Sequence, residues 1–284
     1  IIWGGQFAVA KPILAVIDPF YMTLIRYSIA APLFVLMLLF TEGKSVLTFK
    51  GRFAELFFLG TLGFAGFNLL AFNGLTHASP EHGAVILALM PMITILLTWV
   101  LKGVRPNLFT FMAIISAFFG VFLVITRGHP IQAFSDGEAT SDLMFLLGAF
   151  CWVCYTMGAQ RFPSWSPLRY TALSSSLGTL SITLITIVLT LNGSLQVPTI
   201  NHIILFHWPL VYMVLLAALV AVLSWNIGIK LLGAVNGVLF INFVPITAFV
   251  IGILQGRSFT LAEVVGSSLV IGALIANNLY LRYS

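Results

Sequence analysis

Charged residues are scarce in this chain: they make up 7% of its 284 residues, whereas hydrophobic residues make up 60%. A soluble domain carries roughly 25% charged residues, so this composition excludes a soluble globular protein. Only two cysteines are present, Cys151 and Cys154. They lie in an apolar run without a redox-fold context, so we expect free thiols and neither a disulfide framework nor a redox motif.

Apolar runs long enough to cross a lipid bilayer fill most of the chain. The runs at 83–101 and 143–160 match a hydrocarbon core of about 30 Å. They do not alternate apolar and polar residues as the strands of a membrane barrel do, and backbone groups in lipid must then be satisfied within helices. The sequence predicts an all-α membrane protein. The chain begins at Ile1 and not at Met, so we expect some N-terminal residues to be missing.

Turn residues and charges divide the chain into ten apolar segments. We place them near residues 1–17, 20–40, 53–75, 81–101, 107–126, 143–161, 168–191, 208–232, 234–254 and 260–281. The connections are short, except for a stretch rich in Pro, Gly, Ser and acidic residues between the fifth and sixth segments. We therefore expect one membrane domain of two five-helix repeats, at 1–127 and 143–284, joined by an outer linker at 128–142.

Lysine and arginine predict the orientation, because they are enriched in cytoplasmic loops. One side of the predicted bundle holds Lys44, Lys50, Arg52, Lys102, Arg105, Arg161, Arg169, Lys230 and Arg282, and the other holds Lys11, Arg26, Arg127 and Arg257. Both termini are thus expected in the cytoplasm of a bacterial cell, with the chain in the inner (plasma) membrane. The basic residues are spread over several loops, so no nucleic-acid partner is expected. The lipid bilayer and a small solute are the expected partners of a monomer.

The two halves of the chain show a weak internal repeat. Three pairs align at a shift of 154 residues (228 − 74): Gly74 with Gly228, Gly83 with Gly237, and Pro91 with Pro245. Trp3 in the first segment likewise corresponds to Trp152 in the sixth. Five segments is an odd number, so the second copy would be inserted upside down relative to the first. Such a 5+5 inverted repeat is a transporter architecture with its substrate near the midplane.

A family resemblance follows from the stretch "WGGQFAVAKPILAVIDPFYMTLIRY", from Trp3 to Tyr27. Its Trp-Gly pair, following lysine, Pro-containing turn and arginine early in the second segment resemble the opening of the EamA family in the drug/metabolite transporter superfamily. The Ser-Pro hairpin leading to Met90-Pro91 is similar to that family's third and fourth helices. Within the superfamily the chain looks most like the YddG-like aromatic amino-acid exporters. The resemblance implies ten helices and export. The second half departs from it, because no lysine follows Trp152 as Lys11 follows Trp3.

Polar and aromatic residues inside the segments are the candidates for substrate binding, because polar groups are costly in lipid and normally face the bundle interior. The candidates are Trp3, Gln6, Lys11, Asn68, Asn73, Trp152, Tyr155, Trp225, Asn226 and Asn242. Each has an alternative interpretation. An asparagine can form an interhelical hydrogen bond, a tryptophan can pack against lipid, and Lys11 either extends to the interface or meets an anion such as a substrate carboxylate.

Two prolines and two histidines are candidates for moving parts. Pro91 and Pro245 each free the carbonyl four residues earlier, that of Leu87 or Ile241, so each marks a hinge or a kink accommodated by packing. Ser79-Pro80-Glu81 is a typical helix start. His77 and His82 on either side of it are candidates for an outer gate, and the alternative is a purely structural helix start.

Acidic residues are few, and all of them fall at segment ends or in loops. A proton-coupled exporter of cationic drugs usually keeps a carboxylate within the membrane, so the sequence favours facilitated movement of small neutral metabolites. An inverted repeat is typical of alternating access, and the resemblance implies export, with aromatic amino acids among the solutes. Proton-coupled antiport of a metabolite or drug and a nucleotide-sugar-type carrier are the alternatives. Scattered histidines form no catalytic constellation, so we expect no enzyme, cofactor or metal.

Overall fold

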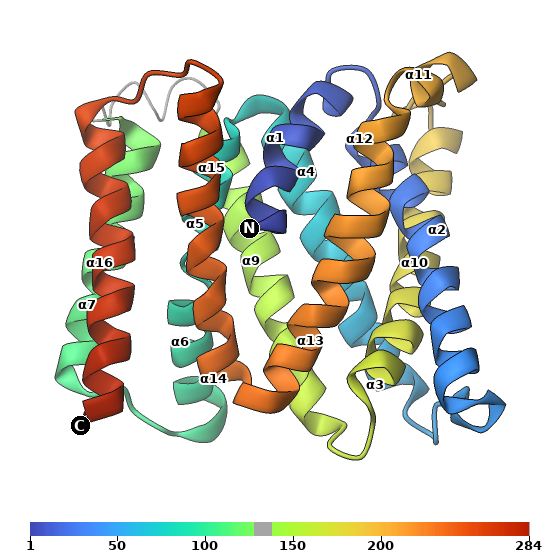
Figure 1. Ribbon diagram of the computed structural model, residues 1–284, viewed down its shortest axis with the longest axis horizontal. Helices are drawn as coiled ribbons and strands as arrows, with labels where there is room; N and C mark the ends of the chain where they lie inside the picture. Colours follow the sequence, from blue (N-terminus) through green and yellow to red (C-terminus); the bar gives the residue numbers. More distant parts are fainter. Residues whose placement is uncertain (128–137, 284) are drawn as a thin grey trace.

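The computed structural model describes residues 1–127 and 138–283, and all regular structure in these two stretches is helical (Figure 1). Seven helices there are long and apolar enough to cross a membrane: Pro19–Glu42, Phe53–His77, Pro80–Lys102, Leu108–Thr126, Thr140–Arg161, Pro167–Leu191 and His207–Leu232. Shorter apolar helices pack beside them at Ile2–Leu14, Phe240–Leu254 and Leu261–Asn277. The prediction of an all-α protein is confirmed. Part of the predicted linker at 128–142 lies outside the described residues.

The helices follow one another along the described residues. The α-helices are α1 (Ile2–Leu14), α2 (Pro19–Glu42), α3 (Phe53–Gly60), α4 (Phe67–His77), α5 (Pro80–Leu87), α6 (Met90–Lys102), α7 (Leu108–Thr126), α9 (Glu138–Gly158), α10 (Pro167–Leu191), α11 (Ile200–Leu205), α12 (His207–Val211), α13 (Ala221–Leu232), α14 (Ala234–Gly237), α15 (Phe243–Leu254) and α16 (Leu261–Tyr283). Other helical turns are η1 (Lys44–Val46), η2 (Thr61–Gly66), η3 (Ala159–Arg161), η4 (Tyr212–Val220) and η5 (Val238–Asn242).

Three helices begin in the same way, with a capping side chain followed by proline. Ser79 Oγ accepts a hydrogen bond from the His82 N–H at 3.4 Å, and Ser166 Oγ accepts one from the Arg169 N–H at 2.9 Å. Asp18 Oδ1 accepts one from the Phe20 N–H at 2.8 Å. A side-chain cap satisfies an N–H group that has no partner within the helix, and proline supplies a residue without an N–H at a position where none is needed. The predicted helix start at Ser79 is confirmed.

Two spans contain π-helical segments that the sequence did not predict. The segment η2 joins α3 to α4, and η4 joins α12 to α13. Each of these spans is the third of its half of the chain. Such i→i+5 turns are rare and often lie at functional sites. A π-helical segment changes the direction in which the following side chains point, so η2 and η4 set the orientation of α4 and α13.

Two other spans are broken just before a proline. The helix α5 ends at Leu87 and α6 begins at Met90, one residue before Pro91. In the second half, the 3-10 turn η5 interrupts the path from α14 to α15 and ends three residues before Pro245. Proline removes an intrahelical hydrogen bond and clashes with the preceding turn, which accounts for both interruptions.

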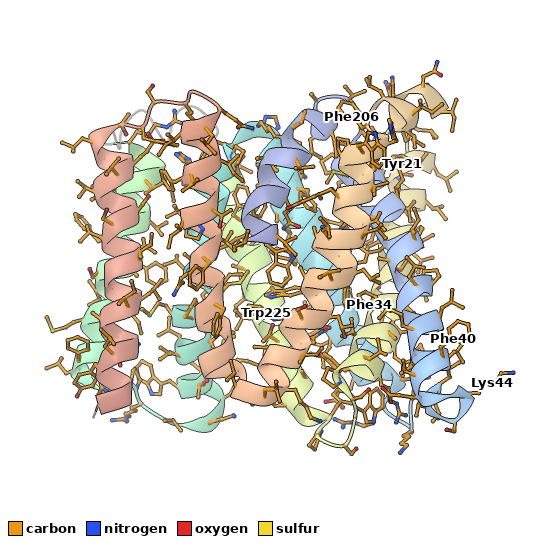
Figure 2. The ribbon with its side chains drawn as sticks, in the orientation of Figure 1. Tyr21, Phe34, Phe40, Lys44, Phe206 and Trp225 are labelled. Carbon is orange, nitrogen blue, oxygen red and sulfur yellow. The ribbon has the colours of Figure 1, made fainter. Side chains whose placement is uncertain are left out.

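Each edge of the molecule is a pair of helices from distant parts of the chain (Figure 1). The helix α7 packs along α16 at one edge, and α2 packs along α10 at the other. Between the edges, α9 lies against α4 and α5, whereas α1 lies against η4 and α15. Large apolar side chains such as Phe40 point outward (Figure 2). This is the surface that a lipid-embedded bundle requires.

Backbones touch where glycines face one another. Gly178 on α10 lies against Gly60 on α3, and a Cβ added at Gly178 would lie 2.5 Å from the Gly60 carbonyl oxygen. Gly120 on α7 meets Gly266 on α16 in the same way, with 2.6 Å from an added Cβ to the Gly266 oxygen. Small residues permit such close approach between membrane helices.

Replacing Gly178 by Ala is expected to destabilise the protein by about 1–3 kcal/mol, because the added methyl group has no room beside the Gly60 backbone. The measurement is the midpoint of thermal unfolding in detergent micelles. Gly272→Ala is the matched control: it lies on α16 with no heavy atom within 4 Å of its added Cβ. Equal midpoints for the two variants would contradict the proposed close crossing.

Candidate substrate site

Three tryptophans from three helices form a cluster inside the bundle. The ring centroids of Trp3 on α1 and Trp152 on α9 are 5.4 Å apart, and Trp225 on α13 lies 5.2 Å from Trp3 and 6.2 Å from Trp152. Trp3 donates its indole N–H to the Ala217 carbonyl at 3.0 Å, and Trp225 donates to Thr156 Oγ1 at 3.1 Å. The Trp152 indole N–H is buried without a partner among the described residues. A buried donor normally has a partner, so this one is available to a solute.

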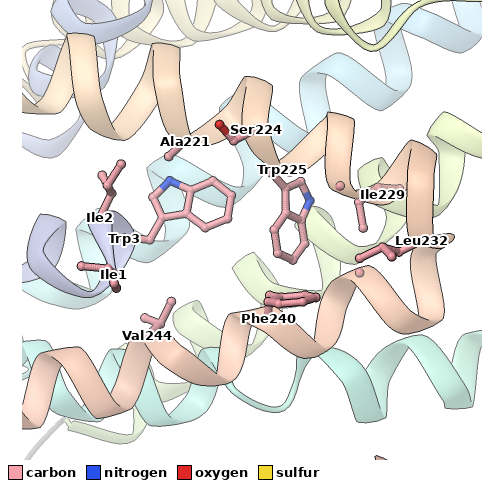
Figure 3. Close-up of a pocket in the computed structure, with 12 residues that line it drawn as sticks. Ile1, Ile2, Trp3, Ala221, Ser224, Trp225, Ile229, Leu232, Phe240 and Val244 are labelled. Carbon is pink, nitrogen blue, oxygen red and sulfur yellow. The ribbon is translucent and has the colours of Figure 1, made fainter. Parts of the chain in front are cut away.

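Two cavities adjoin this cluster. A cavity of about 650 Å³ is lined by Trp3, Ser224, Trp225 and Phe240, and Figure 3 shows Trp3 and Trp225 projecting into it from different helices, with Phe240 on the facing one. Its volume falls in the range of small-molecule sites. A second cavity, which we call the central cavity, has only about 10 Å³ and is lined by Trp3, Gln6, Phe7, Phe67, Leu87, Met90, Trp152, Ile241 and Val244. Nothing larger than one water molecule fits there in this conformation.

The broken helices reach the central cavity. Leu87 precedes Pro91 by four residues and Ile241 precedes Pro245 by four, so neither carbonyl can accept the usual i→i+4 hydrogen bond from the proline. The Ile241 carbonyl accepts from the Phe243 N–H instead. Both residues line the central cavity beside Trp3 and Trp152. Irregular backbone at membrane depth is tolerated where it lines a cavity or is buried in protein, and the two breaks therefore bring irregular backbone to the tryptophans.

A polar cluster lies next to the tryptophans. The Asn226 amide donates to the Tyr155 hydroxyl and to Thr171 Oγ1, both at 2.8 Å. Asn226 Oδ1 is buried without a hydrogen bond among the described residues. The Tyr155 ring lies 5.2 Å from that of Trp152. The structure thus brings together Trp152, Tyr155, Trp225 and Asn226, which the sequence had singled out separately.

The structure places Lys11 elsewhere. Its ammonium group donates to the carbonyl oxygens of Leu75 at 2.7 Å, Thr76 at 3.0 Å and Ala78 at 2.7 Å, at the C-terminal end of α4. A lysine has three protons to donate, so none remains for a substrate carboxylate. Lys11 stabilises the end of a helix, where a cation also complements the helix dipole.

The four other predicted asparagine and glutamine sites lie in different places. Asn68 is buried and binds Arg26, and so does Gln6, which also lines the central cavity. Asn73 is half-buried near the end of α4, where its carbonyl accepts from Thr76 Oγ1 at 2.6 Å. Asn242 ends η5, and its buried Oδ1 has no hydrogen bond among the described residues. Substrate contacts by these residues stay predictions.

Sequence reasoning missed the burial of Arg26, which it grouped with the basic residues of the outer side. The side chain is 2% exposed. The helix α2 begins at Pro19, so residue 26 lies two turns inside the bundle. The signal for this was the apolar sequence on both sides of Arg26. Trp165 is buried against Phe162, whereas Trp208 is 71% exposed.

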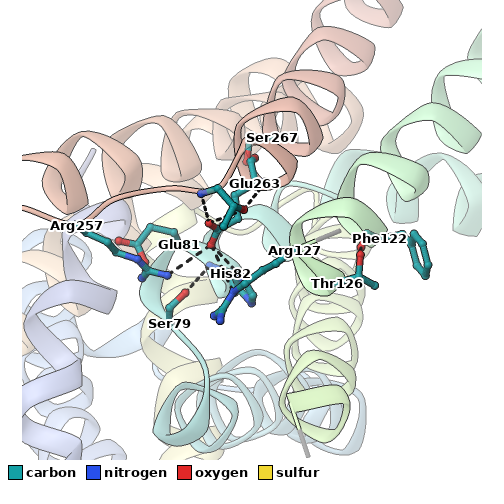
Figure 4. A network of polar contacts seen from close by, with 10 residues as sticks. Ser79, Glu81, His82, Phe122, Thr126, Arg127, Arg257, Glu263 and Ser267 are labelled. Carbon is teal, nitrogen blue, oxygen red and sulfur yellow. Dashed lines mark hydrogen bonds and ion pairs between the residues drawn. The ribbon is translucent and has the colours of Figure 1, made fainter. Parts of the chain in front are cut away.

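An ion-pair cluster (Figure 4), here called the outer cluster after the predicted orientation, lies at the end of the bundle away from α14 (Figure 1). Arg257 pairs with Glu81, and its second nitrogen lies 3.6 Å from Glu263. Glu263 also lies 3.5 Å from His82 Nε2 and 3.7 Å from Arg127 Nε. The cluster joins the start of α5, the end of α7 and the start of α16. Glu81 and Glu263 lie at helix starts, as predicted, but the sequence pattern did not indicate that both side chains are buried.

The two predicted gate histidines have different surroundings. His82 is buried within the outer cluster, whereas His77 is exposed at the end of α4. The ring of His82 has no hydrogen bond within 3.5 Å among the described residues. In the part of the chain that the structure describes, His82 faces the carboxylate of Glu263 and His77 does not.

Residues 1–126 and 139–279 match the EamA-like transporter family, so the chain belongs to this family and is an integral membrane protein. Two Bacillus subtilis relatives are "Uncharacterized transporter YrdR", 38% identical over 99% of this chain and 88% of that protein, and "Uncharacterized transporter YyaM", 31% identical over 96% and 89%. A protein of known crystal structure shares the fold, with a TM-score of 0.71 and 19% identity over 99% of this chain and 94% of the other.

The family resemblance seen in the Trp3–Tyr27 stretch is confirmed by this match. The names of the two Bacillus relatives mark them as transporters and give no substrate. The aromatic amino-acid exporter assignment therefore stays a prediction.

Replacing Arg257 by Gln is expected to loosen the outer cluster, because Glu81 and Glu263 then lose a shared cation. Amide hydrogen exchange at the starts of α5 and α16 should accelerate about tenfold, corresponding to about 1.4 kcal/mol of local stability. The expected loss of local stability is smaller than for a fully buried ion pair, because Arg257 is partly exposed and water screens its charge. Arg105→Gln, in an exposed loop, serves as the control. Unchanged exchange in Arg257→Gln would show that the pairs do not hold this end closed.

Proposed function

We propose that this EamA-family protein exports small neutral metabolites, among them aromatic amino acids, by facilitated alternating access. The observation that carries the proposal is the meeting of the tryptophan cluster with the two broken helices at the central cavity. Indole faces suit an aromatic ring or a cation, the second lone pairs of backbone carbonyls at the helix breaks suit an ammonium group, and the unpaired Trp152 N–H suits an anionic oxygen. A zwitterion uses all three.

The charge of the lining supports a neutral solute. Neither cavity at the tryptophan cluster has an acidic or basic residue in its described lining. A cationic drug would favour a carboxylate there. A nucleotide sugar would favour several cations for its phosphates. The lining therefore favours solutes whose charges cancel.

We further propose that the chain is a 5+5 inverted repeat of ten spans, with halves 1–127 and 143–284 and with 128–142 as an outer linker. The family match falls in two stretches that end and begin near those boundaries. The third span of each half carries a π-helical segment, and the fourth is broken before a proline. The first helix of each half packs against the third and fourth spans of the other half.

Alternating access needs one end closed while the other opens, and the structure is consistent with closure at the outer end. The outer cluster pairs buried carboxylates with Arg257 there. The 650 Å³ cavity instead is lined by Ile229, Leu232 and Gly237 at the junction of α13 and α14, which lies at the opposite end of the bundle (Figure 1). The basic loops assign that opposite end to the cytoplasm. Pro91 and Pro245 are the proposed hinges between the two conformations.

A proton-coupled antiporter is the second candidate, and one observation favours it. Glu81 and Glu263 are buried carboxylates, and His82 lies beside Glu263 at 3.5 Å. Buried carboxylates next to histidine occur in proton relays. They lie in the outer cluster and line neither cavity at the tryptophans, so facilitated transport is preferred.

Uptake of a labelled aromatic amino acid into proteoliposomes tests the proposal directly. Trp152→Ala is expected to reduce uptake tenfold or more, a loss of about 1.4 kcal/mol or more in transition-state or binding free energy, because it removes a central ring and the free indole N–H. Trp208→Ala should leave uptake unchanged, since Trp208 lies on the outer surface. Equal uptake by both variants would contradict a site at the tryptophan cluster.

The same vesicles with an imposed pH gradient separate the two candidates. Facilitated transport predicts equal final uptake with and without the gradient. Accumulation that depends on the gradient and disappears in Glu263→Gln would favour the proton-coupled antiporter.

Pro91→Ala and Pro245→Ala are expected to lower turnover several-fold while leaving equilibrium binding of the same amino acid within about twofold. Alanine restores an N–H group and removes the ring clash, so each helix becomes straighter and stiffer. Turnover is measured in proteoliposomes and binding in micelles. Pro32→Ala within α2 is the control for a helix proline away from the breaks. A parallel loss of turnover in all three variants would argue against hinges at 91 and 245.

A further inference from the structure

Arg26 is a buried cation with neutral partners. Its Nη1 donates to Asn68 Oδ1 at 3.0 Å and its Nη2 to Gln6 Oε1 at 3.3 Å. The rings of Tyr27 and Phe72 flank the guanidinium at 5.1 and 5.8 Å. Its Nε has no hydrogen bond, and no acidic side chain pairs with it among residues 1–127 and 138–283. Transferring an unpaired charge from water is strongly unfavourable, so this site has a high intrinsic affinity for an anion.

The open edge of the guanidinium is the one that binds carboxylates. Nε and Nη2 lie on one side of the planar group and together donate two parallel hydrogen bonds to a carboxylate. Here Nε is free and Nη2 has a contact of 3.3 Å, longer than the 2.7–2.9 Å of a charge-assisted hydrogen bond. The Gln6 amide oxygen accepts from Nη2 where one carboxylate oxygen would, and the Nε–H that would meet the other oxygen is buried without a partner in the described chain.

Gln6 connects Arg26 to the central cavity. It lines that cavity together with Phe7, Trp3 and Trp152. The Phe72 ring that flanks the guanidinium also packs against Phe7, with ring centroids 6.3 Å apart. One layer of side chains therefore separates Arg26 from the tryptophans, and a rotation of Gln6 removes the polar part of that layer.

We propose that Arg26 and Gln6 form the subsite for the carboxylate of the transported solute, and that a carboxylate is required for recognition. The solute's carboxylate displaces the Gln6 oxygen from Nη2 and accepts the free Nε–H. Asn68 is a positioning residue that holds Nη1. This inference rests on the proposed function, because it places the solute at the tryptophan cluster. The role that the sequence left open for Lys11, that of meeting a substrate carboxylate, passes to Arg26.

The rival interpretation is that Arg26 only joins α1, α2 and α4 through Gln6 and Asn68. A purely structural role predicts variants of low stability whose remaining binding is independent of the carboxylate. A carboxylate subsite predicts that substitutions of Arg26 reduce the preference for a carboxylate ligand over a neutral one. Substitutions elsewhere should leave that preference unchanged.

The test compares two ligands of nearly equal shape, 3-phenylpropionate and 3-phenylpropionamide, by equilibrium dialysis with the full chain in micelles. Wild type is expected to bind the carboxylate about tenfold or more tightly than the amide. Arg26→Gln should reduce that ratio to about one, and Arg26→Lys should retain part of it. Arg169→Gln is the matched control, because Arg169 is also a buried arginine whose Nε has no hydrogen bond in the described chain, at the start of α10. Its ratio should equal that of wild type.

A wild type that binds neither ligand, or binds both equally, overturns the inference, and this comparison stands even if Arg26→Gln does not fold. Selectivity that persists in Arg26→Gln, or disappears equally in Arg169→Gln, overturns it as well. The proposed function can be contradicted independently of the proposed subsite. If aromatic amino acids are not transported but the carboxylate selectivity depends on Arg26, the subsite stands and the assigned solutes are wrong. If they are transported and the amide binds as well as the carboxylate, the subsite is wrong.

Discussion

The satisfaction of backbone hydrogen bonds is the constraint on which this architecture depends. Surfaces that face lipid offer no partner for a free N–H or C=O group, so helix interruptions are restricted to enclosed places. Both interruptions, before Pro91 and Pro245, bring Leu87 and Ile241 to one central cavity. Lipid therefore restricts irregular backbone to the enclosed place where we propose that the solute binds. The tryptophan cluster covers the same place with aromatic surface, and Trp3 belongs to both cavities there.

Buried charges lie at several places in the described interior, and two of these bear on the proposed function. Arg26 lies among neutral and aromatic side chains near the tryptophans, whereas the buried carboxylates Glu81 and Glu263 lie in the outer cluster with arginines. A protein carboxylate beside Arg26 would pair with its guanidinium and leave no cation for a solute. On the proposed mechanism, the separation keeps Arg26 for the carboxylate of a solute while ion pairs stabilise the outer end.

The sequence was informative where the cause is local. Hydrophobic run length predicted the helices, the Ser79-Pro80 pair predicted a helix start, and proline chemistry predicted the interruptions. It failed where the partner is distant along the chain. The three carbonyls that bind Lys11 come from the end of another helix, and the side chains that bind the buried Arg26 come from α1 and α4. Trp152 and Trp225 were predicted singly, and their meeting required the tertiary structure.

The edge pairs limit how such a molecule can move. The α7–α16 and α2–α10 pairs each take one helix from each proposed half. A glycine crossing holds the backbones of α7 and α16 together at one edge, and another joins α10 to α3 beside the other edge. Sliding the two halves past one another as rigid blocks would disrupt these contacts. On the proposed mechanism, the edge pairs therefore stay fixed and the spans between them, which include both interrupted helices and both π-helical ones, change shape.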